Sequence, residues 1–194
     1  SIGKRNQIRE NVTIQRGLAS DASTVIQDDN LIMVSAHVGH DCRVGNRCTL
    51  VNHVLLGAYA EVGDGAVLGG AATVDEHCRV GRLAMIGAMT KLTQDVPPYV
   101  TVTDCLVVGL NRVGLSRNGF SAADMLVLKA AYQVIYRQGL RWEEVLTVLK
   151  SEFSQGPADA FSQFFAGGTR GYVQERRLPR KAALKFVSPG EDGP

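Results

Sequence analysis

A branched aliphatic residue stands at every sixth position from Ile26 to Leu92, without a miss. The series is Ile26, Ile32, Val38, Val44, Leu50, Leu56, Val62, Leu68, Val74, Val80, Ile86 and Leu92. An α-helix does not match this period because its faces recur every 3.6 residues, whereas three strand alternations span six residues. The pattern predicts short strands joined by sharp turns, with three strands, and therefore three repeats, in each coil. Such coils stack as a parallel β-helix.

Small residues form a second series, four positions after each aliphatic residue, and glycine often directly follows the aliphatic residue. We expect the small residues to fit at the corners and the glycines to supply the turn dihedral angles. Cys42, Cys48 and Cys78 belong to the small series, so we interpret them as buried apolar side chains and not as disulfide or metal ligands. This use of cysteine is typical of a cytoplasmic protein.

Charge and hydropathy exclude two classes of partner. The formal net charge of +2 on 194 residues is too small to indicate nucleic-acid binding. No apolar run approaches the roughly 20 residues of a membrane span, so we expect no integral membrane contact.

The repeat predicts a mainly β chain whose β-helix occupies residues 1–99. Polar and small residues at 15–24 break the pattern and predict a loop that leaves the coil. The β-helix is expected to end in the segment Asp95–Tyr99, because Pro98 falls on an interior strand position and proline cannot donate to the ladder. Ser1 falls within a repeat, and we therefore expect that earlier coils are missing from this chain.

The remainder of the chain predicts helices. Residues 100–120 are expected to form a transition segment and residues 121–175 a C-terminal α-helical domain. Ser121 is a candidate N-cap, and Gly139 is a candidate stop signal for the helix that Ser121 begins. Residues 176–194 mix basic residues with proline and glycine, and we expect a flexible tail there.

The strongest polar cluster surrounds His40. Val38 points into the predicted core, so His37 and His40 both point outward, and Asp41 follows directly. An outward imidazole beside a carboxylate suits general base catalysis, because the carboxylate can orient the ring. Stacking by three repeats places Ala58 and Glu76 in the column of His40, with Glu76 roughly 10 Å away. The neighbouring column contains Asp41, Tyr59 and His77.

Other interpretations of these side chains stay open. His40 can be a solvated side chain on the outer face of a coil. A zinc site could draw on His37, His40, His53 and His77, although no thiolate or carboxylate grouping with zinc spacing accompanies them. Arg112 and Arg117, in the same segment as Asn111, could contact phosphate or solvate a turn. The stacked residues Arg43, Glu61 and Arg79 are interpreted as a surface charge ladder with little effect on stability.

Apolar residues also occur at outward positions, which predicts that the β-helix oligomerises. These residues are Leu31, Leu55, Val67 and Leu83. Small outward residues from Gly70 to Ala88 would leave a groove along the helix axis.

Several motifs carry a resemblance that extends to about Gly171. They are Asn6–Ile14 with Arg16-Gly17, Ala36–Cys42 with Val44–Cys48, Gln94–Val100, Gly119–Ser121, Ala131-Tyr132, Ile135–Arg137, Phe164–Ala166 and Thr169–Gly171. With these motifs the chain resembles the UDP-N-acetylglucosamine O-acyltransferases that open lipid A synthesis.

The resemblance implies a homotrimer of left-handed β-helices with active sites between subunits and no cofactor or metal. It also implies transfer of a 3-hydroxyacyl chain from acyl carrier protein to the 3-hydroxyl of UDP-N-acetylglucosamine. His40 falls on the general base, Asp41 on its partner and Ala58 on the backbone donor to the oxyanion. The implied substrate contacts are His37, Tyr59, Asp75, Glu76, Ala88, Asn111, Arg117 and Arg170.

The chain departs from the family pattern at some of these positions. Tyr59 and Asp75 stand where the family has histidine, and Glu76 stands where it has glutamine. Val113 and Asn118 replace an acidic residue and an arginine near Asn111. Three alternatives follow: acyl transfer to another sugar nucleotide, such as N-acylation of an amino sugar; a non-catalytic β-helix subunit; or a zinc hydratase.

Overall fold

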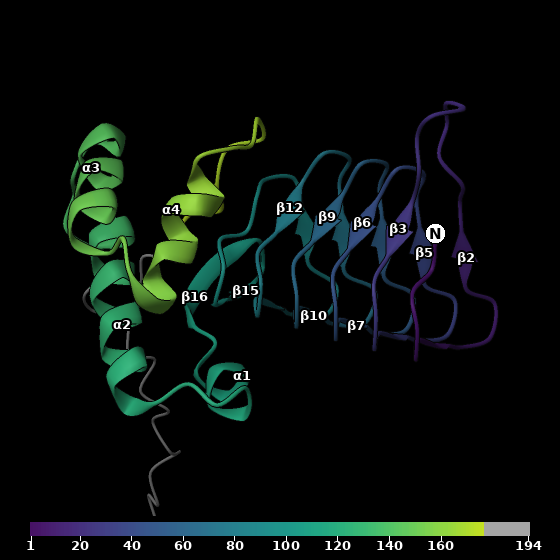
Figure 1. Ribbon diagram of the computed structural model, residues 1–194, viewed down its shortest axis with the longest axis horizontal. Coiled ribbons are helices and arrows are strands. Elements are labelled where there is room, and N and C mark those ends of the chain that lie inside the picture. The colour runs from purple at the N-terminus through teal and green to yellow at the C-terminus, as the bar shows by residue number, and fades with distance from the viewer. Residues whose placement is uncertain (177–194) are drawn as a thin grey trace, which may run out of the picture.

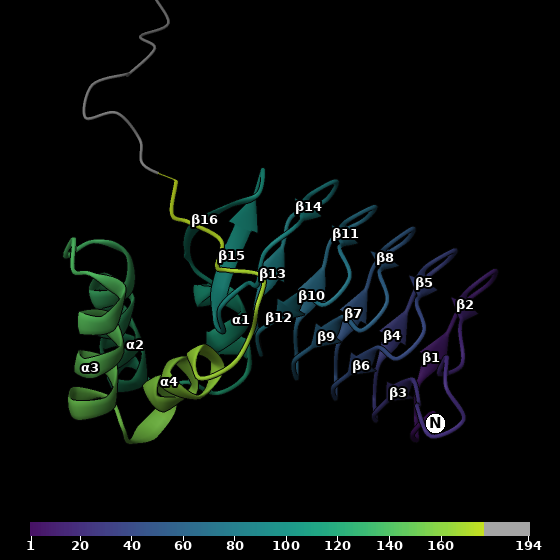
Figure 2. The same ribbon diagram turned by 90° about the horizontal axis from the view of Figure 1, so that it is seen from above.

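This computed structural model describes residues 1–176. Residues 7–92 form the coils of a parallel β-helix, which are built from strands of two residues each (Figure 1). The fold is the left-handed parallel β-helix that the sequence predicts, followed by a C-terminal α-helical domain. Figure 2 shows the helices gathered at the end of the coil stack opposite the N-terminus. Residues 177–194, where most of the predicted tail lies, are outside the described part of the chain.

The strands form three sheets, one for each side of the coil. One sheet contains β3 (Val25–Ile26), β6 (Arg43–Val44), β9 (Glu61–Val62) and β12 (Arg79–Val80). The second contains β2 (Thr13–Ile14), β5 (His37–Val38), β8 (Leu55–Leu56), β11 (Thr73–Val74) and β14 (Lys91–Leu92). The third contains β1 (Gln7–Ile8), β4 (Leu31–Ile32), β7 (Thr49–Leu50), β10 (Val67–Leu68), β13 (Met85–Ile86), β15 (Val100–Thr103) and β16 (Leu106–Leu110).

The stacking register is 18 residues, which equals the three repeats per coil that the sequence predicts. Val38 pairs with Leu56, and Leu56 pairs in turn with Val74 of the next coil. The aliphatic series from Ile26 to Leu92 fills the interior and is at most 3% exposed. Cys42, Cys48 and Cys78 are equally buried and form no disulfide among the described residues. Their burial confirms the interpretation as small apolar side chains.

The glycines that follow the aliphatic residues have a different role from the predicted one. The left-handed backbone positions of the turns are held mainly by non-glycine residues, such as Asp41 at φ 61° and Tyr59 at φ 59°. At Gly57 a Cβ would lie 2.7 Å from the backbone nitrogen of Glu76 in the next coil. Glycine is therefore favoured here by the close approach of stacked backbones and not by the turn dihedral angles.

The β-helix extends beyond its predicted end in the segment Asp95–Tyr99. Val96 bridges Val80, and Val102 of β15 pairs with Ile86, so both pairs are offset by 16 residues instead of 18. Two residues are missing from the last coil, and this shift moves Val96 into the interior position that the strict period assigns to Pro98. Val96 and Val102 are fully buried. Strand β16 then pairs antiparallel with β15.

Four α-helices and one 3₁₀ turn follow. They are α1 (Arg112–Arg117), α2 (Ala122–Tyr136), α3 (Trp142–Glu152), η1 (Gly156–Ala158) and α4 (Asp159–Phe165). Ser121 is the N-cap of α2, as predicted, and forms a capping box with Asp124. Gly139, at φ 71°, lies just beyond the end of α2. None of the described helices is long and apolar enough to cross a membrane.

The helices share a second core with the end of the β-helix. Leu83 is only 4% exposed because it belongs to the cluster that includes Tyr99, Leu115 and Phe161. The expectation that Leu83 adds to an exposed outward surface is therefore wrong. Of the other outward residues, Leu55 is 45% exposed, and Leu31 and Val67 are half-buried.

Arg79 connects the two parts of the molecule. It stacks in register with Glu61, but its guanidinium pairs with Asp95 at 2.7 Å, and the Asp95 side chain is fully buried. The same guanidinium donates to the carbonyl of Gly167 at 2.7 Å and lies over the ring of Phe164. The interpretation of Arg79 as part of a surface ladder is wrong, because the helical domain covers it.

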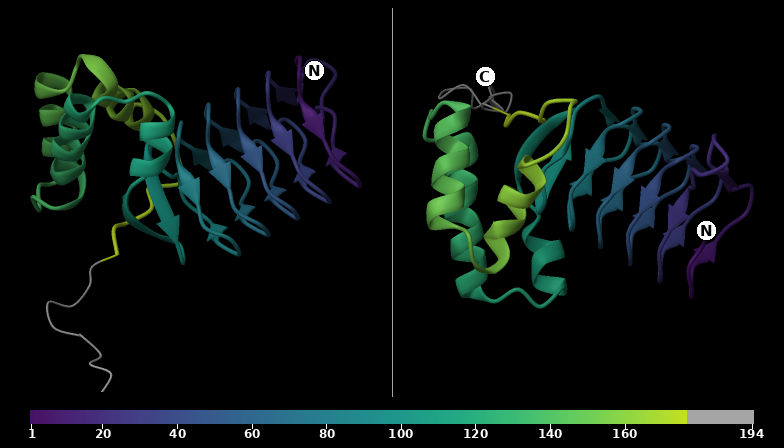
Figure 3. Two further views of the ribbon diagram at one scale, coloured as in Figure 1. Left: turned by 90° about the horizontal axis from the view of Figure 1, so that it is seen from below. Right: turned by 45° about the horizontal axis from the view of Figure 1, so that its top comes forward.

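The chain then returns to the β-helix after α4 (Figure 3). Tyr172 bridges Asp95, and Glu175 bridges Val107 of β16. The carboxylate of Glu175 also accepts from Tyr132 at 2.6 Å and pairs with Arg137 at 2.7 Å, both from the end of α2 and its cap. This return segment brings Arg170 to the side of the coils.

Candidate active site

A shallow depression of about 550 Å³ on the side of the coils brings six of the predicted site residues together. They are His37, His40, Ala58, Asp75, Glu76 and Arg170. The first five come from successive coils, so the stacking register places them, while Arg170 arrives from the segment after α4. Asp75 also lies 3.9 Å from the ammonium of Lys91. The depression therefore holds both an imidazole pair and charges of both signs.

His40 and Asp41 form a hydrogen-bonded pair. The Nδ1 atom of His40 lies 2.8 Å from Oδ2 of Asp41, and the two side chains are 28% and 6% exposed. The hydrogen bond from His40 and a second from the backbone of Leu18 lower the pKa of Asp41, which keeps its carboxylate ionised. Because Asp41 engages Nδ1, the Nε2 atom is the ring nitrogen left for a substrate proton.

Aromatic rings fix one side of His40. The ring of Tyr59 meets His40 edge-on with a centroid distance of 5.2 Å, and it stacks on His77 at 4.6 Å. This contact confirms the predicted column of Asp41, Tyr59 and His77. Tyr59 contacts the imidazole of His40 but does not line the depression.

His37 is held by a residue of the preceding coil. Its Nδ1 atom lies 2.7 Å from Oγ1 of Thr13, and the two residues pair across β5 and β2. This bond orients the imidazole from the side of the stack, next to the same depression that His40 lines.

The backbone of Ala58 presents an unpaired donor. Among residues 1–176 its N–H makes no hydrogen bond, and Ala58 lines the depression. A Cβ at Gly39 would lie 2.9 Å from the Ala58 nitrogen, so glycine at 39 leaves this donor uncovered. A backbone N–H that faces a depression in this way can donate to an oxyanion.

Three predicted substrate contacts lie elsewhere in the chain. Ala88, Asn111 and Arg117 do not line the depression. The side chain of Asn111 caps α1, because its Oδ1 accepts from the N–H of Gly114. Its Nδ2 donates to the carbonyl of Leu83 at 2.9 Å. Arg117 stands in the last turn of α1. Their predicted roles toward substrate stay predictions.

The structure adds residues that the sequence did not single out. Gln15, Leu18 and Thr24 of the interrupted coil all bond to His40 or Asp41. The one signal for them was the break in the repeat directly before the polar cluster. Among the described residues, no group of three or more His, Cys, Asp or Glu side chains is placed to hold a metal ion.

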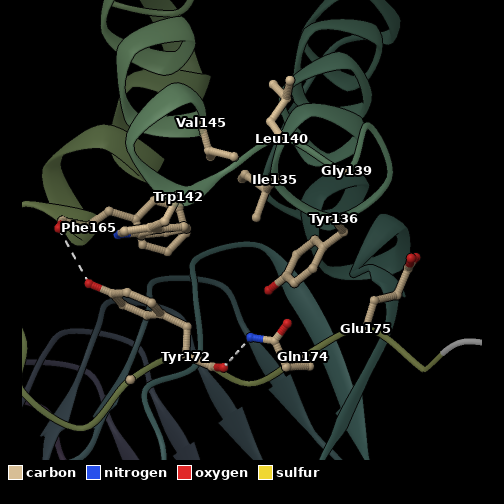
Figure 4. A pocket seen from close by; sticks show the side chains of 11 residues that line it. Ile135, Tyr136, Gly139, Leu140, Trp142, Val145, Phe165, Tyr172, Gln174 and Glu175 are labelled. Carbon is tan, nitrogen blue, oxygen red and sulfur yellow. Dashed lines mark hydrogen bonds between the residues drawn. The ribbon is translucent and has the colours of Figure 1, made fainter.

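A separate hollow of about 860 Å³ lies in the helical domain (Figure 4). Trp142 and Tyr172 lie together on one side of it, with ring centroids 5.1 Å apart and planes tilted by 33°. The amide of Gln174 donates to the carbonyl of Tyr172. Its lining is mainly apolar and includes none of the predicted site residues. No histidine or cysteine stands among the described residues that line it.

The coils and the depression define a hexapeptide-repeat transferase. Residues 23–58 match the family described as bacterial transferase hexapeptide, six repeats, and residues 95–173 match UDP-N-acetylglucosamine O-acyltransferase, domain 2. A protein of Ectopseudomonas mendocina named acyl-(acyl-carrier-protein)–UDP-N-acetylglucosamine O-acyltransferase is 44% identical over 177 residues, which cover 89% of this chain and 69% of the relative. The chain belongs to the UDP-N-acetylglucosamine O-acyltransferase family.

Solved structures agree with this assignment. The UDP-N-acetylglucosamine acyltransferase of Francisella novicida superposes with a TM-score of 0.84 at 34% identity, and that of Arabidopsis with 0.83 at 37%. The matches cover 90% and 89% of this chain. The chain spans 65% of the length of each of those two structures.

Proposed function

We propose that this chain transfers a 3-hydroxyacyl group from acyl carrier protein to the 3-hydroxyl of UDP-N-acetylglucosamine, the opening reaction of lipid A synthesis. Acyl carrier protein and UDP-N-acetylglucosamine come from the names of the relatives, and the 3-hydroxyacyl chain and 3-hydroxyl acceptor from the resemblance to the family. The chemistry comes from the depression. The observation that carries the proposal is the 2.8 Å bond between His40 Nδ1 and Asp41, which orients the ring with Nε2 available.

Each step of the reaction has a residue of this chain to perform it. Nε2 of His40 takes the proton of the sugar hydroxyl while that oxygen attacks the carbonyl carbon of the thioester. The carbonyl oxygen becomes an oxyanion, which the N–H of Ala58 stabilises. The intermediate collapses, the carbon–sulfur bond breaks, and the imidazolium returns the proton to the departing thiolate of the carrier.

The other residues of the depression bind the sugar nucleotide in this proposal. His37, fixed by Thr13, offers a hydrogen-bonding ring nitrogen, and Arg170 offers a positive charge to the nucleotide. Asp75 and Glu76 provide acceptors for sugar hydroxyls. The outward small residues that end at Ala88, itself exposed, form the path of the acyl chain.

We further propose that the active unit is a homotrimer with sites between subunits. Asn111 and Arg117 lie outside the depression of their own chain, so a neighbouring copy would bring its α1 region to the site. Leu55 supports this arrangement, because it is 45% exposed and pairs with His37 across β8 and β5. Light scattering should give a trimer mass, and a monomer at micromolar concentration would contradict a shared site.

The test is acyl transfer from a 3-hydroxyacyl carrier protein to UDP-N-acetylglucosamine. His40→Ala should lower kcat by about 10²–10⁴-fold, the usual contribution of a general base. His53→Ala, which changes an exposed histidine at another corner of the coil, is the matched control and should keep wild-type activity. Wild-type kcat in folded His40→Ala would overturn the proposed mechanism, and an inactive trimeric wild type would favour a non-catalytic β-helix subunit.

A second candidate function is N-acylation of a sugar nucleotide that carries a 3-amino group. The carboxylates of Asp75 and Glu76, both in the depression with His40, favour this acceptor because they attract an amino group more strongly than a neutral hydroxyl. The same assay with the 3-amino analogue decides between the two. A higher kcat/KM for the analogue would replace the hydroxyl acceptor in the proposal.

A further inference from the structure

The loop at residues 15–24, where the hexapeptide repeat is interrupted, is bonded to the catalytic pair at three points. Strands β2 and β5 pair with an offset of 24 residues instead of 18, so this coil is longer than the others by the length of one repeat. We infer that the loop is a positioning element, which holds Asp41 and, through it, the imidazole of His40. The inference rests on the proposed role of His40 as base.

The three bonds come from three separate parts of the loop. The N–H of Leu18 donates to Oδ2 of Asp41 at 3.0 Å, and the N–H of Asp41 donates to Oγ1 of Thr24 at 2.8 Å. The N–H of His40 donates to Oε1 of Gln15 at 3.1 Å. The beginning, middle and end of the loop therefore all contact the pair.

The carboxylate of Asp41 depends on the loop for its orientation. Its Oδ2 accepts from Leu18 and bonds the ring of His40, while its Oδ1 is buried and has no hydrogen-bond partner among residues 1–176. Both identified partners of the carboxylate therefore act on one oxygen. The backbone of Asp41 is in the left-handed region at φ 61°, and its N–H is held by the buried hydroxyl of Thr24. Loss of the Leu18 bond would free the carboxylate to rotate away from Nδ1, and loss of the Thr24 bond would free the backbone that carries it.

The loop keeps its shape through close packing at Gly17. Gly17 is buried, and a Cβ there would clash with the carbonyl of Ala22 and lie 2.7 Å from the nitrogen of Ser23. Because Gly17 directly precedes Leu18, a side chain at 17 would displace the N–H that bonds Asp41. The side chain of Leu18 is 69% exposed and lines a small hollow together with His40. The loop thus also forms one wall beside the base.

The experiment compares kcat and KM for the acceptor in variants of the whole protein. Thr24→Val removes the acceptor for Asp41 N–H while keeping the shape, and should lower kcat at least tenfold with little change in KM. Thr24→Ser restores the hydroxyl and should recover most of kcat. Ser20→Ala, at the loop tip, is the control and should behave as wild type, since no hydrogen bond to its side chain is present in the described structure.

A double variant separates positioning from general damage to the fold. If Thr24 acts through His40, then Thr24→Val should cause no further loss of kcat when it is added to His40→Ala. Gly17→Ala gives an independent test that leaves every bonded side chain in place, and it should lower kcat in the same way as Thr24→Val.

The outcomes distinguish this inference from the proposed function. Full activity in folded Thr24→Val and Gly17→Ala, with activity lost in His40→Ala, would overturn the positioning role and leave the base in place. An equal loss of kcat from Thr24→Val in the wild-type and His40→Ala backgrounds would also overturn it. Unchanged activity in His40→Ala itself would instead remove the proposed mechanism on which the inference rests.

Discussion

Removing the guanidinium of Arg79 should strongly destabilise the protein. The carboxylate of Asp95 is fully buried, and Arg79 satisfies it through the side-chain Nε at 2.8 Å, the terminal nitrogen at 2.7 Å and the backbone N–H at 2.8 Å. Arg79→Met keeps the backbone bond and much of the apolar stem but leaves the ionised carboxylate without its countercharge. Breaking one partner of a buried pair costs about 3–5 kcal/mol of the free energy of unfolding.

The matched control is Arg43→Met. Arg43 stands in the same column, two coils before Arg79 and in register with Glu61, but it is exposed and no salt bridge to it is present among the described residues. Its replacement should change the free energy of unfolding by no more than about 0.5 kcal/mol. The two variants thus exchange the same residue types in the same sheet, and they differ in whether the arginine has a buried carboxylate as its partner.

The assay is urea unfolding at one protein concentration, followed by circular dichroism and by tryptophan fluorescence. The chain has a single tryptophan, Trp142, whose ring lies 4.9 Å from Phe165 and therefore reports on the helical domain next to the junction. Adding Asp95→Asn to Arg79→Met should recover at least about 1 kcal/mol, because no buried ionised group then remains unpaired. A loss below about 1 kcal/mol in Arg79→Met alone would refute this reasoning.

Two more outcomes can be measured directly. Ala88→Met should shift the preference toward shorter acyl donors if the acyl path passes Ala88, and an unchanged chain-length profile in competition assays would place the path elsewhere. Burial raises the pKa of Cys42 to about 11 and of Cys48 to about 12, and it also raises the pKa of Cys78. At pH 8 a disulfide reagent should therefore modify only the exposed Cys105 rapidly in the native protein and all four thiols after denaturation, and a second fast native thiol would contradict the burial of the small series.

The parts of the site that follow the period of six could be predicted from the sequence. A strict stacking offset of 18 residues places Ala58 and Glu76 in the column of His40, and both line the depression with it. The stacked rings of Tyr59 and His77 follow from the same arithmetic. A regular repeat fixes spatial neighbours in advance, because each coil can pair with the next in one register without moving its aliphatic residues out of the core.

Where the six-residue period changes, the sequence does not predict which residues come into contact, because the register is no longer regular. The last coil is two residues short, so Val96 and not the position of Pro98 enters the core. Leu18 and Thr24 lie in a loop without the six-residue period, so their contacts with Asp41 could not be derived from the repeat. The burial of Arg79 depends on residues about 85 positions later in the chain, and no local pattern reveals such a partner.

The bond between Arg79 and Gly167 has a consequence for the order of folding. Neighbouring coils close loops of 18 residues, whereas this junction closes one of 88 residues. The longer closure costs about 1.4 kcal/mol more in chain entropy, since the cost grows as the logarithm of loop length. During synthesis, the coils around Arg79 leave the ribosome long before Gly167 exists. The coils can therefore stack one by one, while the partners of the Arg79 guanidinium are completed only when the last helix arrives.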